Sequence, residues 1–186
     1  HMIAGGEPVN GLNAAPMDVS LRTLKEVHLK PYQKAIDAGV YSIMAAHNEL
    51  NGVPCHMNSW LMTDLFRNQW GFEGFYVSDW MDIERIETLH HVAGSLKEAS
   101  YLSVDAGMDM HMHGVKFPEA VIALVQEGKL SEDVLGAIDA KKVATVEAVD
   151  DTQFSKTLSD FVKSKALVLS SSVLYEIPLY LNSLWT

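Results

Sequence analysis

The stretch that most constrains this chain is residues 71–80, which read GFEGFYVSDW. Two glycines lead into the apolar run Phe75–Val77, whose aromatic and β-branched residues favour strands. Such a run predicts a buried parallel strand. In barrels and doubly wound sheets the chemistry lies at the carboxyl ends of parallel strands, so Asp79 stands where a catalytic group would be. The alternative is that Asp79 caps the next helix.

The rest of the chain alternates between strand and helix patterns. Pro31 interrupts the first helix and predicts a kink or two helices. We expect loops over 1–16 and 48–58, strands over 40–46, 75–79 and 108–112, and helices over 20–38, 60–70, 95–106 and 117–127, with another beginning at Ser131. Strands that alternate with helices imply parallel βα units, and therefore an α/β fold.

Composition excludes several classes of protein. Hydrophobic residues make up 48% and charged residues 20%, as in ordinary globular domains. The net charge of −10 argues against nucleic acid or an anionic membrane as partner. The single cysteine, Cys55, excludes an internal disulfide. No apolar run approaches the roughly 20 residues that span a bilayer, so we expect a soluble protein of unknown location. The opening His1-Met2 is typical of a cloning remnant.

The segment Tyr41–Trp80 resembles the stretch around the nucleophile of family 3 glycoside hydrolases, the β-glucosidase and β-xylosidase group. That family carries a pattern close to MTSYNxxNGVPxxxNxWLLTDLLRxxWGFxGFVVSDW, and this chain reads YSIMAAHNELNGVPCHMNSWLMTDLFRNQWGFEGFYVSDW. The resemblance continues more loosely into a D-x-S-x-R-x-L-like segment upstream, and into AGMDMHM and LVQEGKLSEDVL downstream. It assigns the role of nucleophile to Asp79.

The resemblance also implies a fold and its boundaries. It predicts a partial (β/α)8 barrel over residues 1–134, formed by about the last three βα units. Residues 135–186 would be a divergent tail, with a linker and the start of the family's α/β sandwich domain. The first five strands, the Lys-His pair that the family places on an earlier strand, and the general acid/base would then lie outside this chain. A complete barrel takes about 250 residues.

The implied reaction is retaining hydrolysis of β-linked oligosaccharides or aryl glycosides, and it needs no cofactor. Such enzymes use two carboxyl groups about 5–5.5 Å apart, one as nucleophile and one as acid and then base. Asp79 supplies the first. Trp80 would offer an apolar face to a pyranose ring, or pack between helix and sheet. Asp82, Glu84 and Glu87 follow closely, and we interpret them as solvated charges.

His47 stands where the family usually has Tyr or Phe. We expect it to hydrogen-bond the nucleophile or a sugar hydroxyl, unless it is a loop histidine without a role. Asn48 and Asn51 are expected to hold their loop through bonds from side chain to backbone. Two charged residues three apart, Asp64 and Arg67, predict a local ion pair on one helix.

The run Met108–His113 alternates strictly and predicts a rival chemistry. Asp109, His111 and His113 would share one face of a strand, opposite three methionines. Such a face could hold zinc for metal-assisted hydrolysis, with His47 as a further ligand. The resemblance explains the same run without metal, because the family has Asp-Met-Asp-Met here. It makes Asp109 a neighbour of the sugar site, and we expect no metal.

A third hypothesis is non-catalytic: the chain would be an inactive family 3 fragment or a scaffold protein. Three parallel strands leave two unpaired edges, which favour association. We therefore expect a homo-oligomer or a complementing chain.

Overall fold

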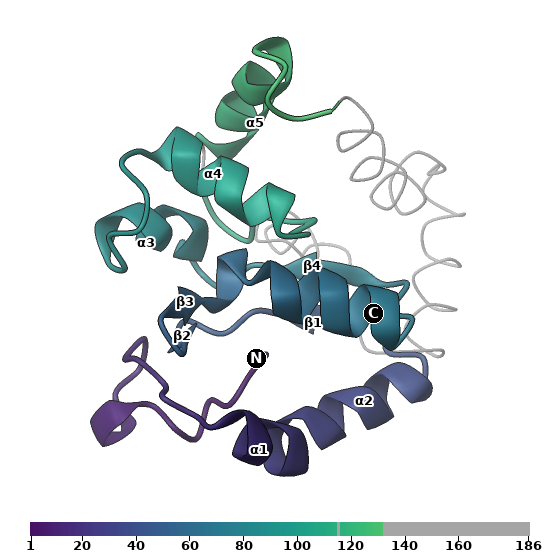
Figure 1. Ribbon diagram of the computed structural model, residues 1–186. Coiled ribbons are helices and arrows are strands. Elements are labelled where there is room, and N and C mark those ends of the chain that lie inside the picture. Colours follow the sequence, from purple (N-terminus) through teal and green to yellow (C-terminus); the bar gives the residue numbers. More distant parts are fainter. Residues whose placement is uncertain (115, 132–186) are drawn as a thin grey trace, which may run out of the picture.

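A computed structural model describes residues 1–114 and 116–131, and its centre is a short parallel sheet. Strand β1 (Ser42–Met44) pairs in parallel with β4 (Phe75–Val77), with Ile43 opposite Tyr76. Two single bridges extend this sheet on both sides, Met2 to Ala45 and Met110 to Val77, and both are parallel. Four parallel segments therefore lie in the order Met2, β1, β4, Met110 (Figure 1).

The start of the chain differs from the expected loop. Met2 is fully buried, donates its N–H to the Met44 carbonyl at 2.7 Å and accepts from the Ala46 N–H at 2.6 Å. Met2 and Ile3 are thus part of the sheet and the core. Apolar Met2 and Ile3 were too short a run to signal a strand. The strand expected over 108–112 is in turn reduced to its bridge at Met110.

The first helical region runs from Leu21 to Asp37, as predicted, and changes type along its length. Segment α1 (Leu21–Thr23) continues into the π-helical η2 (Leu24–His28) and then α2 (Leu29–Asp37). The Ser20 side chain caps the start by accepting the Thr23 N–H at 3.1 Å. Pro31 has no N–H to donate to the preceding turn, and the wide π turn directly before it accommodates that loss.

The loop expected over 48–58 contains a small hairpin. Strands β2 (Glu49–Leu50) and β3 (Val53–Pro54) are joined by Asn51-Gly52, both with positive φ, as in a type I′ turn. The two asparagines bond to backbone as predicted, but across to the N-terminal segment that follows η1 (Val9–Gly11). Asn48 donates to the Ala15 carbonyl at 2.7 Å, and Asn51 exchanges two bonds with the backbone of Val19.

The helix between β1 and β4 forms the crossover connection that two parallel strands require. A 3-10 turn, η3 (Cys55–Met57), leads into η4 (Trp60–Gln69), which has π-type hydrogen bonds over the predicted helix. The Phe66 ring stacks on Tyr32 of α2 at 5.8 Å and on Trp70 at 4.9 Å between centroids. This aromatic stack fixes η4 between α2 and the sheet.

Within residues 1–131, three helices follow β4, and each packs on the next. They are α3 (Asp82–Thr88), α4 (Leu96–Asp105) and α5 (Phe117–Gln126), which lie in succession along one end of the molecule, opposite α1 and α2 (Figure 1). Ser95 caps α4 through the Glu98 N–H. Thr63 of η4 donates to the Ala106 carbonyl at 2.9 Å, which connects the two helical layers.

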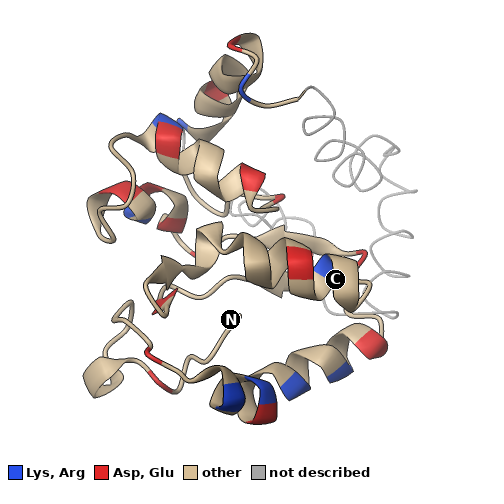
Figure 2. Ribbon diagram, viewed as in Figure 1, with Lys and Arg blue, Asp and Glu red and all other residues tan. Residues whose placement is uncertain are grey.

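The described region has one hydrophobic core, which includes Tyr76 and Phe66 as its largest fully buried side chains. Basic residues gather along α1 to α2, whereas acidic residues are spread over both sides of the sheet (Figure 2). None of the helices described here is long and apolar enough to span a bilayer. The predicted helix from Ser131 and the tail 135–186 lie outside the described residues, as does the boundary at 134.

Candidate active site

Asp79 lies two residues beyond the end of β4, at the carboxyl end of the parallel sheet. Its Oδ1 accepts the Trp80 N–H at 2.7 Å. The preceding Ser78 hydroxyl donates to the Asp79 carbonyl and accepts the Met112 N–H, both at 2.9 Å. The alternative role as a helix cap is wrong, because the N-cap of α3 is Met81 and has no side-chain bond. The Asp79 side chain is thus free for another purpose and only 10% exposed.

A buried histidine supports the backbone of Asp79. His56 follows the hairpin, and its Nε2 accepts the Asp79 N–H at 2.9 Å. Burial, and after it the neighbouring His47 imidazole, lower the pKa of His56 to about 3. His56 is therefore neutral, and its 3.6 Å approach to Asp82 Oδ2 is not an ion pair. His56 occupies an unspecified position of the family pattern, so the resemblance did not mark it.

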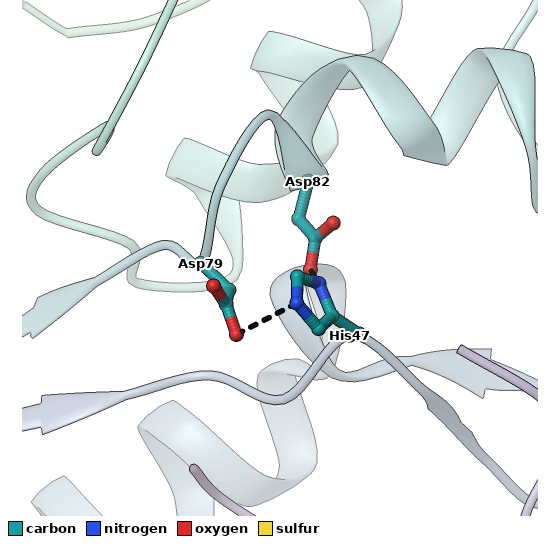
Figure 3. A group of neighbouring side chains, drawn as sticks. All are labelled: His47, Asp79 and Asp82. Atoms are coloured by element: carbon teal, nitrogen blue, oxygen red, sulfur yellow. Dashed lines mark hydrogen bonds and ion pairs between the residues drawn. The ribbon is translucent and has the colours of Figure 1, made fainter. Parts of the chain in front are cut away.

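His47 lies between two carboxylates, as Figure 3 shows. Its Nε2 is 3.2 Å from Asp79 Oδ2, and its Nδ1 is 2.6 Å from Asp82 Oδ2. His47 thus lies beside the Asp79 carboxylate as predicted, but the hydrogen bond expected between them is not formed, because the two groups are not aligned for it. On the far side of the cluster, Arg85 Nη1 lies 2.8 Å from Asp82 Oδ1 and 3.1 Å from His47 Nδ1.

The interpretation of Asp82 as a solvated charge is wrong, since its side chain is 1% exposed. Burial raises the pKa of Asp82, while His47 and Arg85 act in the opposite direction. Glu84 is also paired, with Oε2 at 2.8 Å from His111 Nε2. The charge pattern of the helix could reveal Arg85, three residues further on, but not His47, which follows β1, or His111, which follows Met110.

The second oxygen of Asp79 faces two imidazoles. His1 Nε2 and His47 Nε2 each lie 3.2 Å from Asp79 Oδ2, but neither is aligned as a hydrogen bond, and Oδ2 has no solvent-exposed surface. His1 is 61% exposed and His47 only 19%, so His1 is the side chain that can move away from Oδ2. Sequence reasoning missed His1 because its strand segment is so short.

Trp80 is 46% exposed, so the alternative of packing between helix and sheet is wrong. One face of its indole stacks on His113, with ring centroids 4.0 Å apart and planes 8° from parallel. The stack fixes the orientation of an exposed aromatic ring beside Asp79 in the sequence. Its role toward a sugar remains a prediction.

Asp109 lies at the other end of β4 from Asp79. Its Oδ2 accepts the Tyr76 N–H at 2.8 Å and a bond from Arg67 Nη2 at 2.5 Å. The predicted pair of Arg67 with Asp64 is wrong, because Arg67 extends to Asp109 and to the Gly74 carbonyl. These are the contacts of a structural ion pair at the start of the strand. They do not support the prediction that Asp109 is a neighbour of the sugar site.

The zinc set predicted on the run after Met108 is not assembled. Asp109 pairs with Arg67, His111 bonds Glu84, and His113 stacks on Trp80. The run is not a regular strand, so its alternate side chains do not share one face. Within the described part of the chain, donor atoms that could hold a cation gather instead at His47, Asp79 and Asp82, within 4.8 Å of one another. The Arg85 guanidinium beside them makes a proton-bearing cluster the better interpretation.

Four parallel segments, alternating with helices and bearing a carboxylate at their carboxyl end, define part of a βα barrel with its catalytic face. The sequence profile of the glycosyl hydrolase family 3 N terminal domain matches residues 1–146. The chain therefore belongs to glycosyl hydrolase family 3, and its described fold is a part of that family's TIM barrel.

Relatives with known names agree with this membership. The chain is similar to a beta-xylosidase of Formosa agariphila, at 45% identity over 60% of this chain and 16% of the relative. It is similar to the lysosomal beta glucosidase of Dictyostelium discoideum, at 35% identity over 73% of this chain and 17% of the relative. The chain thus spans about a sixth of the length of each of these two relatives.

The fold is similar to that of the beta-glucosidase from Listeria innocua, whose crystal structure gives a TM-score of 0.74 at 33% identity. The match covers 77% of this chain and 20% of that one. The same enzyme has been crystallised with glucose and with isofagomine.

Proposed function

We propose that this chain carries the nucleophile half of a retaining β-glycosidase, and that Asp79 is the nucleophile. The observation that carries the proposal is the Asp79 carboxylate, which is buried at the carboxyl end of β4 with Oδ2 free of aligned hydrogen bonds. Relatives named beta-xylosidase and beta-glucosidase support β-linked glycosides as the substrate class. The anomeric carbon of such a sugar would meet Asp79 Oδ2.

The reaction has two steps. Asp79 Oδ2 attacks the anomeric carbon, the bond to the leaving oxygen breaks, and a carboxylic acid protonates that oxygen. Water then attacks the same carbon, its proton goes to the same group acting as base, and the electron pair of the sugar ester returns to Asp79. Nucleophilic catalysis requires Asp79 to be ionised, and the Trp80 N–H on Oδ1 stabilises that form.

The acid of this reaction is not Asp82. Asp82 is within reach of the cluster, but its oxygens are bonded to His47 and Arg85 and its side chain is buried. It lies behind His47, where a leaving oxygen cannot reach it. We place the general acid/base in another part of the complete enzyme, as the resemblance implies.

Two side chains around Asp79 can contact the sugar. Trp80 offers one free indole face, because His113 covers the other, and apolar sugar faces stack on such rings. His1 covers Asp79 Oδ2 and is exposed, so a bound sugar would displace it and could bond its Nε2.

Trapping the sugar ester tests the proposal. We expect a 2-fluoro glycoside with a good leaving group to label the protein once, on the peptide that contains Asp79, as seen by mass spectrometry. Asp79→Asn should abolish labelling and reduce aryl β-glycoside turnover by about 10⁴-fold or more, because the amide lacks the nucleophilic charge. Asp64→Asn is the matched control, since Asp64 is exposed on η4 and should leave both unchanged.

Other outcomes discriminate the rival hypotheses. Labelling on another residue would overturn the assignment of Asp79. A folded chain with neither labelling nor turnover would favour the inactive fragment or scaffold. Turnover that is lost with chelator and restored by zinc would favour the metal-dependent hydrolase.

A further inference from the structure

Each ring nitrogen of His47 lies close to a carboxylate oxygen. Nε2 faces Asp79 Oδ2 at 3.2 Å, and Nδ1 faces Asp82 Oδ2 at 2.6 Å. A neutral imidazole has one N–H and can donate to one of them only. The other ring nitrogen would then turn a lone pair toward a carboxylate oxygen, which is repulsive. Both contacts are attractive together only when both ring nitrogens carry a proton. The Nδ1 proton then goes to Asp82 Oδ2 at 2.6 Å, and Arg85 Nη1, which lies 3.1 Å from Nδ1, donates to Asp82 Oδ1 and not to the ring.

The charges around His47 lead to the same protonation state. With Asp79 and Asp82 ionised, Arg85 supplies one positive charge and a doubly protonated His47 supplies the second, so the cluster is neutral. A neutral His47 would leave one uncompensated negative charge in a mostly buried site, which is costly. Other titratable groups face this cluster from the N-terminus, η3 and the end of α3, namely His1, His56 and His90.

Those three histidines do not supply the missing charge. His56 is neutral and uses Nε2 to accept the Asp79 N–H. His90 contacts the His47 carbonyl through Nε2 and is paired with Glu49 through Nδ1 at 3.3 Å, away from the His47 ring. His1 is exposed, and a sugar at Asp79 would displace it. The less exposed of the two imidazoles beside Asp79 Oδ2 is therefore His47, which is held in turn by Asp82.

We propose that Asp82 is a positioning residue that acts on Asp79 through His47, by holding the imidazole doubly protonated with the positive charge of the ring beside the nucleophile, 3.2 Å from Nε2 to Oδ2. The inference rests on the proposed function for its catalytic meaning. In the second step, the bond between the sugar carbon and Asp79 breaks and its electron pair returns to the carboxylate. A cation held beside that carboxylate stabilises the returning charge, so the pair should assist release of the sugar from the enzyme.

The first test needs no turnover. In histidine-¹⁵N-labelled protein, long-range proton–nitrogen spectra report which ring nitrogens carry protons, and His47→Phe identifies the His47 signals by their loss. We expect both His47 nitrogens to be protonated at pH 7 in the wild type and a neutral ring in Asp82→Asn. Glu84→Gln is the matched control on the same helix, because Glu84 bonds His111 and not His47.

The wild-type spectrum tests the proposal even if Asp82→Asn does not fold, because it reports the protonation of His47 directly. A neutral His47 at pH 7 in the wild type would overturn it, and so would a doubly protonated ring in folded Asp82→Asn. A result in the expected direction would support the pair even if the chain proved inactive toward every glycoside. Failure of the proposed function and failure of this inference are thereby distinguishable.

The second test is kinetic and uses a dinitrophenyl β-glycoside, whose leaving group departs easily, so that release from Asp79 limits kcat. We expect Asp82→Asn to lower kcat by about 10- to 100-fold, the size of one charge-assisted hydrogen bond in the transition state, with a lower KM as the sugar ester accumulates. In a His47→Phe background the same change should have no further effect. Additive losses, with KM unchanged, would show that Asp82 is merely structural.

Discussion

At the scale of single residues, the site depends on His56, which burial prevents from taking up a second proton. The Nε2 of His56 accepts the Asp79 N–H, so a proton on Nε2 would turn one donor toward another and break this hydrogen bond. Burial holds the pKa of His56 at about 3 in the fold, whereas an exposed histidine in the unfolded chain titrates near 6.5. The difference couples the stability of the nucleophile's loop to pH.

We predict that this coupling can be measured. Because the pKa of His56 is lower in the fold, its contribution is fully present above pH 6.5 and is lost as the pH falls toward 3. The slope from this group is at most about 1.4 kcal/mol of unfolding free energy per pH unit. His56→Gln retains an acceptor that cannot titrate, and should flatten the curve between pH 6.5 and 4.5 in urea unfolding followed by tryptophan fluorescence. An unchanged slope would contradict the burial argument.

At the scale of elements, the β2–β3 hairpin positions His47 and His56 through its asparagine turn. Asn51 combines a left-handed backbone, φ 50°, with two side-chain bonds to Val19, one of 2.7 Å and one of 2.9 Å. The hairpin is thereby tied to the segment before α1. Strands of two residues have little stability alone, so these bonds set where the loop lies.

Two substitutions separate the effect of the Asn51 side-chain hydrogen bonds from the effect of its left-handed backbone. Asn51→Gly keeps the left-handed conformation and loses both bonds, and we expect it to reduce the unfolding free energy by about 1–3 kcal/mol. Asn51→Ala also places a Cβ in that conformation and should cost about 1 kcal/mol more. Equal losses from both variants in denaturant titrations would show that the backbone conformation is not under strain. Gly52→Ala is a useful comparison, because Gly52 has open space around it and φ 82°.

At the scale of the whole molecule, the described sheet is open at both sides. Among the described residues, Met2 pairs on the β1 side only and Met110 on the β4 side only. A barrel closes such edges by pairing its first and last strands, whereas an open parallel sheet presents apolar edges to solvent. The family's complete barrel would cover them.

We therefore predict that this chain self-associates. Light scattering coupled to size exclusion at low micromolar concentration should give a mass of at least twice 20.6 kDa. Increasing salt should not dissociate the assembly, because apolar burial rather than charge drives it. A well-ordered monomer would contradict this prediction and would mean that residues after Val134 cover the sheet.

Local sequence determined the elements and the identity of the nucleophile candidate. Hydrophobic runs and caps specify helices and strands through contacts a few residues apart, so β4, α4 and the place of Asp79 at a strand end could be predicted. Tertiary structure alone decided the partners of Asp79, because His1, His47 and His56 come from three separate segments that meet at one sheet edge. It also decided that Asp82 is buried and Asp109 paired with Arg67, since burial and charge pairing depend on what lies across space.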